Sequence, residues 1–244
     1  MSIRRLFNAL TLFLLCLTVC AQARAQGDNR ARAAAEIESL REQIRAREAV
    51  LLAPSDEDRK AHAEFLARPD TGLVRLLPRE KWDNKLSMRG GGAYYSFTLR
   101  TNEYGHSTDI GLEQGQFQVG FGGADFGFMT ELGDVPLEAV STQAEAVRFM
   151  AGFEAPSAEA EARRAGRQFY PAHREGEWSY TRRLLAAPGR TYAVRSIVYG
   201  ESDVLVAFRV VRKDDDGSVV LLWKLLEKYR TPSLQRSAAA APGQ

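Results

Sequence analysis

Two runs near the C-terminal end constrain the fold of this chain more than any other feature. Residues 204–208 read Val-Leu-Val-Ala-Phe and residues 219–223 read Val-Val-Leu-Leu-Trp, so both runs are apolar on both faces. Strands of this kind are covered on both sides, by a second layer or by helices. Between them, residues 213–218 read Lys-Asp-Asp-Asp-Gly-Ser, and Asp and Gly tolerate the left-handed conformation of a hairpin turn. We therefore expect a hairpin inside a layered fold, with an exposed turn at its tip.

The other strands are predicted in two groups, each marked by alternating apolar and polar residues. Ala93, Tyr95, Phe97 and Leu99 alternate with more polar neighbours, which predicts a half-buried strand over residues 93–100 at the start of an antiparallel meander. The remaining expected strands are residues 108–113, 116–121, 124–131, 191–199, 203–212 and 218–227. The expected fold is α+β with a mainly antiparallel sheet, which closes into a barrel, curls into a half-barrel or stacks as a sandwich.

The predicted organisation has four parts. Residues 1–25 form a signal peptide, and residues 26–69 form an N-terminal helical segment. Residues 70–230 form the antiparallel β-rich domain, in which a helical insertion at about residues 137–169 separates the two strand groups. Residues 231–244 form a disordered tail, because they are rich in Ser, Ala, Pro and Gly.

The N-terminal helical segment begins with an amphipathic stretch. Its apolar residues recur at steps of three, four and seven between Ile37 and Leu51. We expect this stripe to pack on the rest of the molecule; a short coiled coil is the alternative, although Arg47 interrupts its seam. A second helix is expected after Ser55, which has capping-box spacing with Asp58.

The first 25 residues have the layout of a secretory signal. Residues 4–5 are both Arg, residues 6–19 are an apolar run, and residues 23–25 read Ala-Arg-Ala. These features predict a signal peptide that is cleaved before Gln26. The apolar run is shorter than the roughly 20 residues of a spanning helix, so no stable membrane span is expected after cleavage. The expected localisation is secreted or periplasmic.

Cysteine and charge exclude several kinds of chemistry. Cys16 and Cys20 are the only cysteines, and both lie in the predicted signal peptide. The mature chain would therefore have no thiol nucleophile, no Cys-ligated metal and no disulfide. Lys and Arg number 33 and Asp and Glu number 31, without a basic block of the kind that nucleic-acid-binding proteins carry. We therefore expect no nucleic-acid partner.

Four stretches carry a resemblance to a family. RGGGAYYSF, GADFGF, LGDVPLE and SDVLVAFRVVRKDDDGSVVLLWKLL resemble sequences of an uncharacterised family of secreted bacterial proteins with no assigned function. The similarity covers most of residues 55–234. It implies that this domain is a unit found elsewhere, and it carries no activity, ligand or site residue to this chain.

The glycine-rich stretch RGGGA, residues 89–93, raises the question of a ligand-binding loop. A phosphate loop needs Lys-Ser or Lys-Thr and a helix after its last glycine, and a dinucleotide fingerprint needs a strand before its glycines. Here a strand is predicted after the glycines. The stretch therefore predicts a turn in which glycine permits a positive φ or a close approach of the main chain. The alternative is that Arg89 and the glycine amides line the rim of a ligand site.

Candidate catalytic residues are few. His106 and Asp109 lie in a predicted turn between strands, and Asp125 from a later strand could join them to orient a general base or to hold a metal. No second histidine has metal-like spacing and no Gly-x-Ser-x-Gly elbow exists, so a solvated turn histidine is favoured. An EF-hand register of the Asp-rich turn would place Arg212 and Trp223 at ligand positions, so no metal site is predicted. No cofactor is expected.

Aromatic residues concentrate in the first strand group, where Tyr95 and Phe97 would point to the same face of one strand. Most of these side chains are expected in the core, but a curved sheet could use the same face to line a pocket for a hydrophobic small molecule. This favours a secreted or periplasmic non-enzymatic domain that binds a hydrophobic ligand or an envelope protein. The alternatives are a hydrolase-like enzyme centred on His106 and Asp109, and a purely structural envelope protein.

Overall fold

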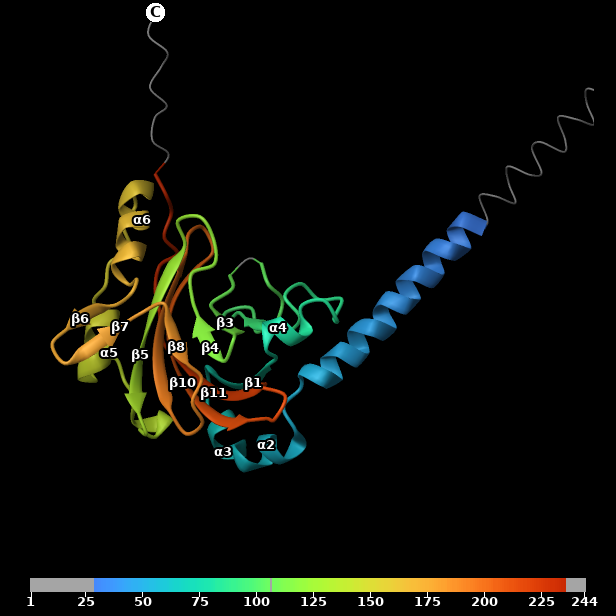
Figure 1. The fold of residues 1–244 in the computed structure, drawn as a ribbon, viewed down its shortest axis with the longest axis horizontal. Coiled ribbons are helices and arrows are strands. Elements are labelled where there is room, and N and C mark those ends of the chain that lie inside the picture. Colours follow the sequence, from blue (N-terminus) through green and yellow to red (C-terminus); the bar gives the residue numbers. More distant parts are fainter. Residues whose placement is uncertain (1–28, 106, 236–244) are drawn as a thin grey trace, which may run out of the picture. The chain divides into compact units, whose positions relative to one another are not determined.

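The structure is a computed structural model that describes residues 29–105 and 107–235. The chain divides into two compact units, Met1–Ala49 and Val50–Gln244 (Figure 1). In the first unit, residues 29–49 are helical throughout. The predicted signal peptide lies outside the described residues. Among the residues described, no helix is both long enough and apolar enough to cross a membrane.

The second unit is built on a five-stranded antiparallel sheet (Figure 1). Its strand order is β1-β11-β10-β9-β5. The strands are β1 Thr71–Leu76, β5 Phe126–Gly133, β9 Thr191–Val198, β10 Ser202–Lys213 and β11 Val219–Lys228. The hairpin expected from the two apolar runs is confirmed, because β10 pairs with β11 from Val204 to Lys213.

A smaller antiparallel sheet has the order β2-β3-β4-β8, and a separate two-stranded ribbon pairs β6 with β7. The strands of the small sheet are β2 Tyr94–Tyr95, β3 Ile110–Glu113, β4 Gln116–Gln118 and β8 Arg183–Leu185. The ribbon consists of β6 His173–Glu175 and β7 Trp178–Tyr180.

Short helices precede and interrupt the strands. They are α2 Asp56–Ala61, α3 Ala63–Leu66, α4 Arg79–Trp82, the 3-10 helix η1 Leu137–Ala139, α5 Glu145–Ala151 and α6 Glu159–Gln168. The predicted capping box is present: Ser55 Oγ accepts a hydrogen bond from Asp58 N–H at 3.1 Å, and Asp58 Oδ2 accepts one from Ser55 N–H at 3.2 Å. These reciprocal bonds satisfy two amides that a helix start otherwise leaves open.

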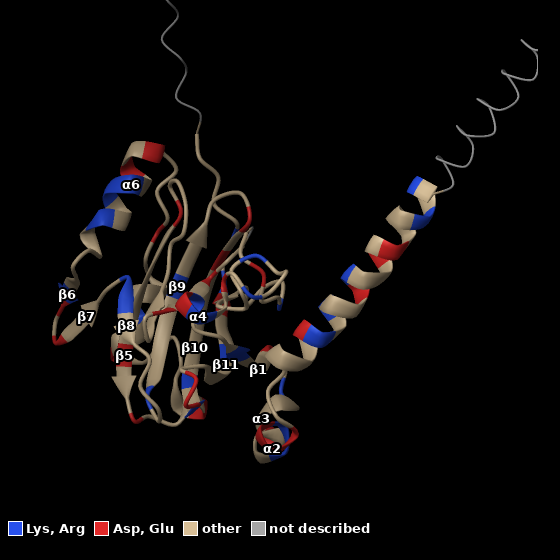
Figure 2. Cartoon of the chain, turned by 45° about the vertical axis from the view of Figure 1, so that its right-hand side comes forward, with Lys and Arg blue, Asp and Glu red and all other residues tan. Residues whose placement is uncertain are grey.

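The three layers of the second unit explain why its central strands are apolar on both faces. Figure 1 shows α5 and α6 on one side of the five-stranded sheet and strands β3 and β4 on the other. Val206 and Phe208 of β10 belong to the core between the two sheets, whereas Leu205 and Ala207 belong to the core beneath the helices. Figure 2 shows the middle of β10 as largely uncharged. The α+β, mainly antiparallel fold is confirmed, and its two sheets face each other across one core.

Two strands differ from the sequence prediction: one is shorter than expected, and one pairs with a strand of the other sheet. The strand expected over residues 93–100 reduces to Tyr94–Tyr95, because the chain turns back at once: Arg100 N–H donates to Ser96 C=O at 2.8 Å, with Arg100 at φ 55°. The expected meander also stops after β4, since β5 pairs with β9 in the large sheet. Gly120, at φ 75°, stands where the chain leaves the small sheet.

Candidate binding sites

The three glycines form a turn that glycine alone can make without strain. Gly90, Gly91 and Gly92 have φ values of 85°, 60° and 74°, a region that other L-residues rarely adopt. A Cβ built at Gly91 would lie 2.5 Å from Asp83 N, so the main chain also approaches too closely for a side chain. The turn is fixed next to Arg89, whose C=O accepts a hydrogen bond from Tyr104 N–H at 2.9 Å.

Arg89, a predicted ligand-site residue, lines an open cavity of about 220 Å³. We call it the Arg89 cavity. Its wall includes two aromatic residues, Tyr104 and Phe121, and two acids, Asp125 and Glu201. The chain therefore brings Arg89 and Asp125, two residues singled out from the sequence, to the same cavity.

Aromatic rings pack tightly on one side of this cavity. The ring centroids of Tyr94 and Tyr104 are 4.6 Å apart, and those of Tyr94 and Phe121 are 5.2 Å apart with an edge-to-face angle of 86°. The Arg89 guanidinium lies over the Tyr104 ring, 5.0 Å from its centroid. Such contacts hold a cation in place while leaving its N–H groups free to donate.

The acidic side of the cavity is held by hydrogen bonds. Asp125 Oδ1 accepts a hydrogen bond from Tyr199 N–H at 2.9 Å, and Glu201 Oε2 accepts one from Ser107 Oγ at 2.8 Å. Burial raises the pKa of Asp125, and the nearby Glu201 charge raises it further, against the opposing effect of the Tyr199 amide. Two carboxylates in a shared, partly dehydrated space favour a cationic group between them.

The structure gives two of the candidate catalytic residues, Asp109 and Asp125, different environments. Asp109 is fully buried, and its Oδ2 accepts a hydrogen bond from Phe97 N–H at 2.8 Å. Its other oxygen has no hydrogen-bond partner among residues 29–105 and 107–235. Burial outweighs the favourable influence of the Ser196 hydroxyl and raises the pKa of Asp109 to about 6. Asp109 therefore holds the chain inside the domain and does not itself line the cavity that Asp125 lines, although its neighbour Thr108 does. His106 lies outside the described residues.

Tyr95 and Phe97, the other candidate ligand-site residues, are part of the core between the sheets. Their rings are 5.4 Å apart, and that of Phe97 is 5.3 Å from the Trp223 ring. They do share a face, as the alternation predicts, and both are buried. Neither lines the Arg89 cavity or the groove described below. Their shared surface is filled by protein side chains.

The Asp-rich turn, expected to be exposed, is instead partly buried by ion pairs. Arg75 of β1 lies 3.1 Å from Asp214 and 3.4 Å from Asp216, and Asp214 also pairs with Arg212 at 2.6 Å. Within the described part of the chain, no three His, Cys, Asp or Glu side chains come together in a way that could hold a metal ion. These acids therefore fasten the hairpin to β1.

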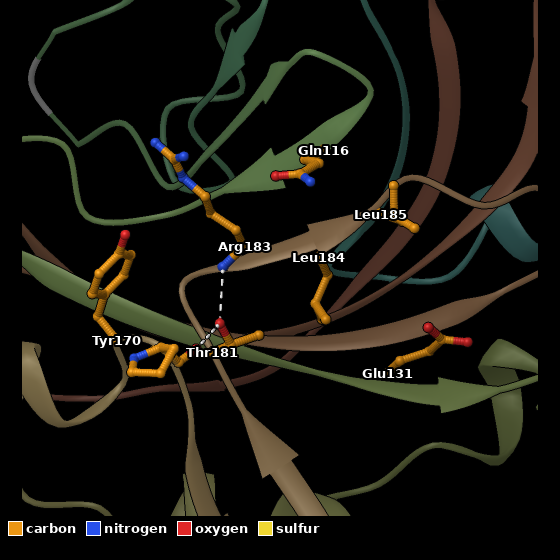
Figure 3. Close-up of a pocket in the computed structure, with 8 residues that line it drawn as sticks. Gln116, Glu131, Tyr170, Thr181, Arg183, Leu184 and Leu185 are labelled. Atoms are coloured by element: carbon orange, nitrogen blue, oxygen red, sulfur yellow. Dashed lines mark hydrogen bonds between the residues drawn. The ribbon is translucent and has the colours of Figure 1, made fainter.

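A second, larger depression lies beside β8, and no pattern in the sequence predicts it. We call it the β8 groove. It has a volume of about 460 Å³, and Figure 3 shows side chains from β8 and β5 on its opposite sides. Tyr170 and Leu185 at this groove are 69% and 66% exposed, which is unusual for side chains of their size. Its lining residues are Gln116, Glu131, Tyr170, Pro171, Thr181, Arg183, Leu184 and Leu185.

The hydrogen-bond pattern of β8 shows which of its main-chain groups face this groove. Arg182 C=O accepts a hydrogen bond from Val119 N–H, and Ala186 N–H donates to Gly115 C=O. The main-chain groups of even-numbered residues in and beside β8 therefore form hydrogen bonds with β4 and its flanking residues. Arg183 and Leu185 turn their main-chain groups to the other edge, because successive residues of a strand alternate. On β5, Met129 exchanges two main-chain hydrogen bonds with Thr181. The main-chain N–H and C=O groups of odd-numbered β5 residues therefore point toward the β8 groove.

Comparisons with known proteins add no relative to this picture. No family model, no curated protein and no solved structure matches the chain. The two sites are therefore interpreted from the geometry and chemistry of their own residues.

Proposed function

We propose that the mature chain is an exported, non-enzymatic domain that binds an extended peptide segment of an envelope protein in the β8 groove. One observation carries this proposal. Arg183 C=O and Leu185 N–H point away from β4, and no described residue forms a hydrogen bond with either group. A strand edge with open donors and acceptors is a template on which an extended peptide can add a strand.

The side chains around this edge suit such a peptide. Leu184 and Leu185 lie on opposite faces of β8, so the groove and its rim both offer apolar contact to alternate side chains of a bound strand. Tyr170 adds an exposed aromatic ring of the kind enriched at protein interfaces. Peptide side chains in a bound strand also alternate, which matches this arrangement.

Charges at the two sides of the groove would set the direction of the peptide. Glu131 on the β5 side pairs with Arg190 at 3.5 Å, and Arg183 on the β8 side donates to Gln118 Oε1 at 3.4 Å. Both contacts are long and exposed, so they compete weakly with a charged partner. Opposite charges at opposite sides distinguish one peptide orientation from the other.

The exported location rests on the sequence. The signal-peptide layout of residues 1–25 favours a secreted or periplasmic domain. An envelope protein is then the class of partner that such a domain would meet.

A selection from a displayed random octapeptide library tests the proposal, with the affinities of recovered peptides measured by fluorescence anisotropy. We expect Leu185→Asp to raise the Kd by about tenfold or more, because a charge would replace an apolar contact. Methylating alternate peptide amides should weaken binding where the amide pairs with Arg183 C=O. Leu99→Asp is the matched control, since Leu99 is 56% exposed and lies outside the groove. Failure to recover peptides, or equal affinity for the Leu185 variant and wild type, would contradict this function.

A further inference from the structure

Two opposite charges, those of Arg89 and Asp125, line the Arg89 cavity. Arg89 and Asp125 both line it, yet within residues 29–105 and 107–235 neither forms an ion pair with any side chain. Arg89 makes its contact with the ring of Tyr104 instead, and Asp125 with the amide of Tyr199. The two charges therefore lie on one cavity without meeting.

The second carboxylate oxygen of Asp125 is not engaged by the Tyr199 amide. Asp125 makes its hydrogen bond through Oδ1, and a Cβ built at Gly122 would be 4.0 Å from Oδ2. Gly122 is itself exposed and lines the cavity. Oδ2 is thus placed where a donor group of a bound molecule could reach it.

We propose that the Arg89 cavity binds a compact zwitterion of the chemical class of free α-amino acids. Arg89 receives the carboxylate, since a guanidinium donates two parallel hydrogen bonds to a carboxylate. Asp125 accepts hydrogen bonds from the ammonium group, and Glu201 adds negative charge beside it. Tyr104 and Phe121 provide the apolar wall for the side chain of the ligand.

A ligand with a single charge fits this cavity less well. An anion attracted by Arg89 would meet the carboxylates of Asp125 and Glu201, and a simple cation attracted by these acids would meet Arg89. A zwitterion pairs each charge with its opposite. The volume of about 220 Å³ limits the ligand to a small molecule.

Isothermal titration of the mature protein with each of the twenty free L-amino acids tests the proposal. L-phenylalanine is the reference probe because of the aromatic wall, and phenethylamine and 3-phenylpropionate are its analogues without the carboxylate and without the ammonium group. We expect saturable binding of at least one aromatic amino acid below about 1 mM, and binding about tenfold weaker for both analogues. Absence of saturable binding for all twenty up to about 10 mM would overturn the proposal.

Two variants assign the charges. Arg89→Gln should weaken binding of L-phenylalanine by about tenfold but leave that of phenethylamine unchanged, because phenethylamine has no carboxylate. Asp125→Asn should weaken L-phenylalanine but not 3-phenylpropionate, and its amide oxygen can still accept from Tyr199 N–H. Arg174→Gln, at an exposed position of β6, is the control and should change none of the three affinities. Equal losses for all three probes in either cavity variant would contradict the assignment.

Discussion

Arg195 of β9 and Asp203 of β10 form a bidentate ion pair inside the second unit. Arg195 Nε lies 2.6 Å from Asp203 Oδ1 and Arg195 Nη2 lies 2.9 Å from Oδ2, and the side chains are 1% and 4% exposed. Arg195 Nη1 also donates to Met150 C=O at 3.0 Å, and the guanidinium lies over the Tyr229 ring. One buried cation thus connects the sheet, the end of α5 and the segment after β11.

The first prediction concerns this pair. Asp203→Ala should lower the free energy of unfolding by roughly 3–5 kcal/mol, because it leaves Arg195 buried without a counter-charge. Urea unfolding followed by circular dichroism measures the loss. Asp215→Ala, at an exposed position of the hairpin turn, is the control and should change stability by about 0.5 kcal/mol or less. A similar small effect at Asp203 would show that the pair does not stabilise the fold.

The second prediction separates the two reasons for glycine at position 91. Gly91 and Gly176 have nearly equal φ values, 60° and 59°, but a Cβ at Gly176 would meet nothing within 4 Å. Gly176→Ala should therefore cost only the left-handed strain of about 1–2 kcal/mol. Gly91→Ala should cost at least about 2 kcal/mol more, since its Cβ would overlap the main chain at Asp83. Equal thermal and urea stability of the two variants would rule out the close approach.

The third prediction is a pH dependence that belongs to Asp109. Its pKa is raised to about 6 in the folded protein, so the folded state holds this proton more tightly than the unfolded chain. The stability contributed by the protonated group is complete below pH 4 and is lost as pH rises through 6. Asp109→Asn removes the titration and should gain on the order of 2–3 kcal/mol relative to wild type between pH 4 and pH 7.

Urea unfolding of both proteins at several pH values measures this gain. Asp215→Asn serves as the control, because its side chain is exposed and its stability difference from wild type should not follow the same curve. A stability difference for Asp109→Asn that stays constant from pH 4 to pH 7 would contradict the buried, late-titrating carboxyl.

Local patterns predicted the elements that depend on local chemistry. The hairpin of β10 and β11 follows from two runs that are apolar on both faces, and the capping box follows from Ser55 and Asp58 alone. The positive φ of Gly91 follows from a run of glycines before a strand. In each of these cases the deciding residues are neighbours in sequence or repeat with a fixed period.

Such patterns do not predict contacts between segments that are distant in the sequence. Nothing local indicates that β5 pairs with β9 rather than with β4, or that Arg75 lies beside Asp214. Local patterns single out Arg89 and Asp125 separately, but their common cavity depends on how the small sheet packs on the large one. The β8 groove was missed because β8 has only three residues, too few for an alternation to be recognised.

The last prediction uses two neighbouring acids of the hairpin turn. Asp214 is 24% exposed in its side chain and accepts from Arg212 Nε at 2.6 Å and from Ser218 Oγ at 3.1 Å, whereas Asp215 is exposed. Asp214→Ala should therefore lower the free energy of unfolding by about 1–3 kcal/mol at pH 7, and Asp215→Ala by about 0.5 kcal/mol or less.

The pH dependence of that loss distinguishes ion pairing from simple packing. Burial acts to raise the pKa of Asp214, but the hydrogen bonds and charges of Arg212, Ser218 and Arg75 outweigh it and lower the pKa. Because the pKa of Asp214 is lower in the folded protein than in the unfolded chain, its ionised carboxylate stabilises the fold at pH values above its pKa in the unfolded chain. This stabilisation is lost as the pH falls through its pKa in the folded protein. The difference between wild type and Asp214→Ala should thus shrink below about pH 4 in urea unfolding. If the difference is as large in acid as at pH 7, the contribution of Asp214 comes from packing and not from its charge.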